Sequence, residues 1–61
     1  MNTTYICTEN GFVKDFEDDS SERELGDRVT FDGKYYAVTD IEPIFQDGRW
    51  TRTAFHLRLL P

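Results

Sequence analysis

Hydrophobic and polar residues alternate along much of this chain, with the period of two that is typical of half-buried β-strands. The pattern is longest near the C-terminal end, where one face holds Thr51, Thr53, Phe55, Leu57 and Leu59. The other face holds Trp50, Arg52, Ala54, His56 and Arg58. We therefore expect a long final strand from residue 49 to about residue 60.

Segments rich in β-branched and aromatic residues predict four shorter strands, at 3–8, 12–16, 28–31 and 34–41. Asn10-Gly11, Asp32-Gly33 and Asp47-Gly48 are turn dipeptides, because Asn, Asp and Gly tolerate the left-handed backbone that tight hairpin turns need. Pro43 is expected to end the strand before it, because proline has no N–H to donate to a ladder.

The segment between the second and third expected strands is acidic and polar. Ser21 and Glu24 have the spacing of a helix capping box, and Gly26 stands where a helix would end. We expect one short helical turn over residues 21–25, with Leu25 against one end of the core.

Five short strands in 61 residues favour closure of a sheet on itself, which also protects its edges. We expect a single all-β domain over residues 1–61, a small five-stranded antiparallel barrel of the SH3 type or a strongly bent sheet. The alternative is an open sheet that another chain completes. The expected core is Tyr5 or Ile6, with Val13, Val29, Phe31, Tyr36, Val38, Phe55, Leu57 and Leu59.

Small size and composition argue against an enzyme, since an active-site cleft would remove core from a chain only 38% hydrophobic. Ser20, Ser21 and His56 lack the spacing of a catalytic triad, and Cys7 is more often a packed apolar residue. Asp15, Glu17 and Asp19 begin like a calcium loop, but the glycine and the final glutamate of that loop are missing. We expect no catalytic residue, no metal and no cofactor.

Charge is distributed unevenly along the chain, whose net charge is −5. Residues 15–27, here called the acidic loop, hold seven acids and one base, whereas residues 49–61 hold three arginines and no acid. The acidic loop is either a solvated segment or a binding surface, whose candidate residues are Asp15, Glu17, Asp18, Asp19, Glu22 and Glu24. A second candidate surface for a protein partner is a basic and aromatic face made of Trp50, Arg52, His56, Arg58, Tyr35 and Phe45. An acidic chain is not expected to bind nucleic acid directly.

One stretch resembles the closing part of tailed-bacteriophage head-to-tail joining proteins, the adaptor and stopper families. The matching segments are Gly26-Asp27-Arg28-Val29, Asp32-Gly33-Lys34, Tyr36, Val38, Asp40-Ile41-Glu42-Pro43, Asp47-Gly48-Arg49 and Leu57-Arg58-Leu59. The resemblance covers residues 26–60 and implies a structural protein that acts in several copies. It also implies contacts to phage structural proteins, or to further copies of the chain, by strand addition and charge pairing.

A second hypothesis is a small acidic phage-encoded inhibitor that occupies the basic nucleic-acid groove of a host nuclease or polymerase. The acidic loop would then present carboxylates in place of phosphates. In either case no secretory signal or membrane span is visible, so we expect a protein of the virion or the host cytoplasm.

Overall fold

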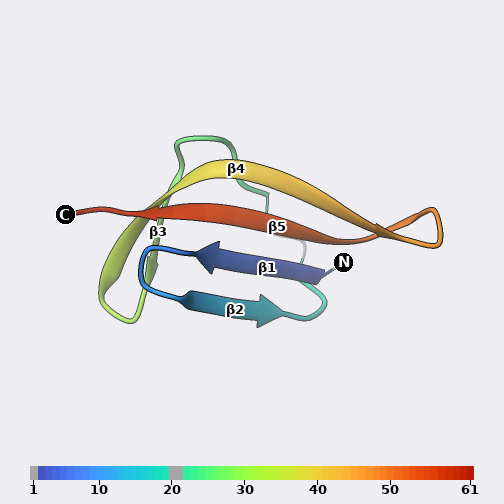
Figure 1. The fold of residues 1–61 in the computed structure, drawn as a ribbon, viewed down its shortest axis with the longest axis horizontal. Coiled ribbons are helices and arrows are strands. Elements are labelled where there is room, and N and C mark those ends of the chain that lie inside the picture. The colour runs from blue at the N-terminus through green and yellow to red at the C-terminus, as the bar shows by residue number, and fades with distance from the viewer. Residues whose placement is uncertain (1, 20–21) are drawn as a thin grey trace.

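The computed structural model describes residues 2–19 and 22–61, and these form five strands in one sheet (Figure 1). The strands are β1 (Asn2–Cys7), β2 (Phe12–Phe16), β3 (Arg28–Phe31), β4 (Lys34–Gln46) and β5 (Arg49–Leu59). The sheet curls into a half-barrel, and the described residues contain no helix. The expected all-β class and strongly bent sheet are confirmed.

The strand order is β2-β1-β5-β4-β3, so the first and last strands lie side by side at the centre of the sheet. β1 and β5 run parallel, whereas the other three pairings are antiparallel. The expectation of a purely antiparallel sheet is therefore wrong. Hairpin turns dictate antiparallel neighbours, but no local signal reports the direction in which two distant strands meet.

The hairpin of β4 and β5 is much longer than expected, because β4 passes through Pro43 and ends at Gln46. The expectation that Pro43 ends this strand is wrong. β3 pairs with β4 only as far as Ala37, so at Pro43 the strand has β5 on one side and no strand on the other. An edge position tolerates proline, since the missing N–H can face away from the ladder.

Two register shifts change which side chains share a face along this hairpin, the first between Val38 and Asp40. At the second shift, Ile44 pairs with Arg52 and Phe45 pairs with Trp50, so Thr51 between them has no register partner on β4. Ile44 and Phe45 are consecutive and point to opposite faces, so Trp50 lies on the face opposite Arg52. Strict alternation along β5 predicted the same face for these two residues, and that prediction is wrong.

The core lies on the concave face of the sheet, and most of the expected residues belong to it. The buried members are Tyr5, Cys7, Val29, Tyr36, Val38, Phe55 and Leu57, with Phe12, Phe16, Phe31, Ile41 and Leu59 packed against them. The expectation for Val13 is wrong, because its side chain is 61% exposed. Val13 pairs with Ile6 on the convex face, and the alternation of β2 gives the core Phe12 and Phe16 instead.

Aromatic side chains close the half-barrel between its two edge strands, β2 and β3. The ring of Phe31 on β3 lies 5.1 Å from that of Phe12 and 6.1 Å from that of Phe16, both on β2. Tyr5 from the centre of the sheet approaches Phe31 at 4.9 Å. Aromatic rings at these separations stabilise the fold by more than their buried area alone, so side-chain packing joins the two edges, which no strand pairing connects.

The acidic loop turns without a helix in its described part. The N–H of Asp27 donates to the carbonyl of Glu24 at 3.1 Å, with Gly26 at φ 88°, which is the geometry of a tight β-turn. Gly26 and Val38 are linked by a further backbone hydrogen bond of 2.8 Å. The helical turn expected over residues 21–25 is wrong for residues 22–25, and Ser21 lies outside the described residues. Leu25 is 65% exposed, so it does not close the core.

Candidate functional site

Arg52 on the convex face joins the two oppositely charged segments of the chain. Its guanidinium lies 3.2 Å from a carboxylate oxygen of Glu17 and 3.5 Å from one of Asp15. It also donates to the hydroxyl of Thr4 at 2.9 Å and to the carbonyl of Thr3 at 3.3 Å. The Arg52 side chain is only 24% exposed, so this pairing is part of the folded surface.

The sheet register explains why these groups meet. Thr4 in β1 pairs with Asp15 of β2 on one side and with Ala54 of β5 on the other. Its hydroxyl donates to the Asp15 carboxylate, and Arg52 shares the convex face with Ala54. Asp15, Glu17 and Arg52 therefore satisfy one another within a single chain, although the sequence suggested two separate charged surfaces.

A second contact between side chains lies further along the same convex face. His56 Nε2 lies 2.8 Å from a carboxylate oxygen of Glu42, with both side chains partly exposed. Glu42 was not among the residues expected to form a binding surface. The alternating acids Asp40 and Glu42 on β4, the hairpin partner of the basic strand β5, could have indicated this contact.

The described remainder of the acidic loop is anchored to β1 by its backbone. The N–H of Asp18 donates to the side chain of Asn2, and the hydroxyl of Thr3 lies 3.4 Å from the carbonyl of Asp19. The side chains of Glu22 and Glu24 are exposed on the far arm of the loop. Both residues line the pocket described next.

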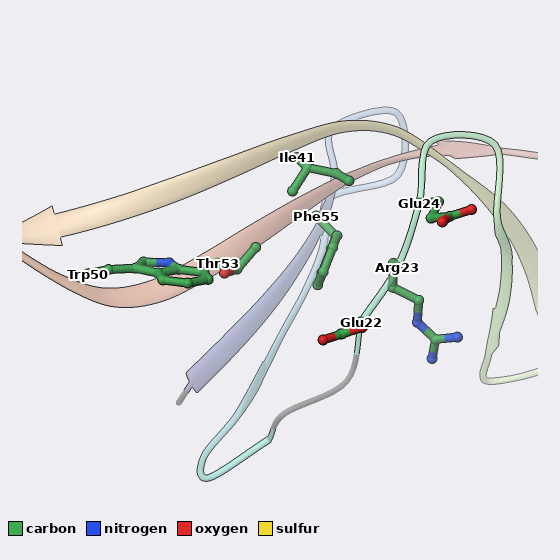
Figure 2. Close-up of a pocket in the computed structure, with 7 residues that line it drawn as sticks. All are labelled: Glu22, Arg23, Glu24, Ile41, Trp50, Thr53 and Phe55. Carbon is green, nitrogen blue, oxygen red and sulfur yellow. The ribbon is translucent and has the colours of Figure 1, made fainter.

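A pocket of about 290 Å³ lies between the acidic loop and the β4–β5 hairpin (Figure 2). Its lining residues are Glu22, Arg23, Glu24, Ile41, Trp50, Thr53 and Phe55. The strands contribute the apolar and aromatic side chains, and the loop contributes the charged ones. The Nε of Arg23 donates to the hydroxyl of the buried Tyr5 at 3.1 Å, which fixes the loop above the sheet.

Phe45 and Trp50 face each other across the outer part of the β4–β5 hairpin. Their side chains are 60% and 50% exposed. The indole N–H of Trp50 donates to the carbonyl of Arg52 at 3.0 Å, which fixes the orientation of the ring. This end of the hairpin extends beyond β1 and β2 in a molecule 39 Å long and 19 Å wide (Figure 1).

The expected basic and aromatic face is divided among three regions of the surface. Trp50 and Phe45 lie at the hairpin end, and Arg52 and His56 contact carboxylates of the same chain on the convex face. Tyr35 lines a separate depression of about 340 Å³ with Arg28, Leu60 and Pro61. Arg58 is exposed on β5, and its register partner on β4, Ala37, is also the partner of Arg28 on β3. The six residues do not form one continuous patch.

The residues that could take part in metal binding or catalysis are dispersed in the described part of the chain, residues 2–19 and 22–61. No set of three or more His, Cys, Asp or Glu side chains in this part of the chain could hold a metal ion. Cys7 is fully buried in the core, and His56 is engaged by Glu42. In the same described part, no helix has the length and hydropathy needed to cross a membrane.

No protein-family model, no curated protein and no solved structure matches the chain. The candidate site therefore rests on this chain's own geometry, in which the pocket beside Trp50 combines apolar, aromatic and acidic groups.

Proposed function

We propose that this protein is a non-enzymatic protein-interaction module that docks through the outer end of the β4–β5 hairpin. The observation that carries the proposal is the exposed aromatic pair Phe45 and Trp50 on a hairpin that extends beyond the rest of the sheet. Large aromatic side chains are enriched at the energetic centres of protein interfaces, where a partner removes them from water. A small domain gains little by holding two such rings in solvent.

We further propose that the partners are phage structural proteins and that the chain acts in several copies during virion assembly. The support is the resemblance of residues 26–60 to head-to-tail joining proteins. β2 and β3 are the two edges of the sheet, and each offers unpaired backbone groups for strand addition. Both features suit a protein that is held between neighbours in a larger assembly.

The inhibitor hypothesis finds less support in the charges. A phosphate mimic needs carboxylates that are free to meet a basic groove, and Asp15 and Glu17 are already paired with Arg52. Asp18, Glu22 and Glu24 remain exposed, which is a small anionic surface for such a role.

Site-specific photo-cross-linking in the cells that produce the protein tests the proposal. A photoreactive phenylalanine analogue at position 45 is expected to capture capsid, portal or tail proteins, which mass spectrometry would identify. The matched control places the same analogue at Asp32, in the turn between β3 and β4, and should capture none of them. Capture of a nuclease or polymerase from position 18 would favour the inhibitor instead. The absence of any cross-linked partner at position 45 would reject the hairpin as the docking element.

A further inference from the structure

The pocket beside Trp50 has two chemically different sides. Trp50, Phe55 and Ile41 come from the hairpin and provide an aromatic and aliphatic wall. Glu22 and Glu24 come from the acidic loop, and the carboxylate of Glu22 lies on the side of the loop that faces this wall, whereas that of Glu24 points away from it (Figure 2). A side chain that fills this space must therefore combine an apolar stem with a polar or charged end.

The charge at the rim selects a cation. Figure 2 shows the carboxylate of Glu22 on the side of the loop nearer Trp50, whereas the guanidinium of Arg23 is turned away from Trp50. Arg23 also uses its Nε to bind the hydroxyl of Tyr5, so it is held in that orientation. A cation can thus approach Glu22 without displacing Arg23.

The aromatic wall favours the same ligand. Tryptophan attracts cations more strongly than other aromatic side chains, because its ring face carries the largest negative potential. The indole is held in place by its hydrogen bond to the carbonyl of Arg52, so it does not have to be ordered on binding. The methylene stem of a lysine fits against apolar surface while its ammonium group stays near a carboxylate.

We propose that this pocket binds the side chain of a lysine presented by the partner protein, with its methylene stem against the aromatic and aliphatic wall and its ammonium group between the ring of Trp50 and the carboxylate of Glu22. The inference rests on the proposed function, since it names the chemistry that the partner presents. It assigns a role to Glu22 and Trp50 together, which the sequence placed on two different surfaces.

Peptide binding to the purified 61-residue protein tests the pocket directly. The probe is a capped nine-residue Gly-Ser peptide with one central lysine, and the matched control peptide has norleucine at that position. Trp50 is the only tryptophan of the chain, so its fluorescence reports on the pocket. We expect a saturable change in emission with the lysine peptide, weakened by added salt, and binding at least tenfold weaker for the norleucine peptide.

Variants separate the pocket from general charge attraction. Glu22→Gln should weaken lysine-peptide binding about fivefold, as expected for loss of a surface ion pair. Asp32→Asn removes the same charge at a turn outside the pocket and should leave binding unchanged. Trp50→Phe keeps an aromatic ring at this position and should weaken binding of the lysine peptide. Because this variant lacks the tryptophan, its binding is measured by NMR chemical shifts.

Three results would overturn the inference: equal binding of the norleucine peptide, equal effects of Glu22→Gln and Asp32→Asn, or no saturation below about 10 mM, which corresponds to less than about 3 kcal/mol. These results are independent of cross-linking at position 45. Cross-links without lysine-peptide binding would reject the pocket and retain the docking function. Lysine-peptide binding without cross-links would retain the pocket and reject the hairpin as the docking element.

Discussion

The guanidinium of Arg52 lies 3.2 Å from the carboxylate of Glu17, a residue 35 positions earlier in the chain. This contact brings together the basic last strand and the acidic loop, which the sequence presents as opposite ends of a polar molecule. The same guanidinium also reaches Asp15 and Thr4. Part of the charge that could have attracted a partner therefore stabilises the fold.

Replacing Arg52 with Gln is expected to lower the free energy of unfolding by about 1 to 2 kcal/mol, because a partly buried network loses the guanidinium that joins its members. Urea denaturation followed by circular dichroism would measure the change. Arg58→Gln is the matched control, since Arg58 is exposed and the described residues offer it no ion pair, and its effect should stay below about 0.5 kcal/mol. Equal effects of the two substitutions would show that the network adds nothing to stability.

Phe31 should be among the most sensitive positions in the domain. Its ring contacts Tyr5, Phe12, Phe16 and Tyr36, so it links the two edge strands through the core. We expect Phe31→Ala to destabilise by about 3 kcal/mol, which is large beside the roughly 3 to 9 kcal/mol expected for 61 residues. Thermal unfolding would reveal a large loss of Tm or an unfolded chain.

The exposed ring of Phe45 provides the comparison for Phe31. Phe45→Ala makes the same chemical change at a side chain that is 60% exposed, and should cost less than about 1 kcal/mol. If the two alanine variants melt at the same temperature, the aromatic closure between β2 and β3 does not contribute as described.

Gly33 in the turn between β3 and β4 has φ 75°, and Asp32 before it has φ 51°. Gly33→Ala forces a Cβ into the left-handed region and should destabilise by about 1 to 2 kcal/mol, although no atom blocks the added Cβ. Asp32→Asn should be nearly neutral, because asparagine tolerates this conformation. Chemical denaturation of both variants would measure the difference, and a neutral Gly33→Ala would contradict the turn geometry.

The thiol of Cys7 is completely buried and lies in the centre of the core. A thiol reagent added in excess should therefore react at the rate of unfolding, or with the small fraction of open molecules, and not at the rate of a free thiol. Denaturant should restore full reactivity. Immediate reaction under native conditions would show that β1 opens readily at the centre of the sheet.

Much of the strand pattern could be predicted from local residues. The alternation from Thr53 to Leu59 correctly identified the core face of β5, and the Asp32-Gly33 turn correctly separated β3 from β4. These features depend on neighbours only a few positions apart. A short run of residues is enough to express a period of two or the need for a left-handed turn.

The candidate site could not be predicted in the same way. Trp50 lies on the face opposite the expected one, because β5 has one extra residue between the pairs Ile44–Arg52 and Phe45–Trp50. Alternation within one strand cannot reveal such a mismatch. Val13 was expected in the core because it is apolar, but β2 offers phenylalanine on one face and valine on the other. Packing of the complete sheet decided which face was buried.

Local residue patterns are enough to define this protein as a small all-β domain, to locate most of its strands, and to show where its charges and aromatic residues concentrate along the chain. Three features appear only in the folded sheet: the parallel pairing of β1 with β5, the contact of Arg52 with Glu17, and the pocket that Glu22 shares with Trp50. The reason is physical. Strand propensity and turn conformation are local energies, whereas these contacts join segments about 30 to 50 residues apart and exist only when the whole sheet has formed.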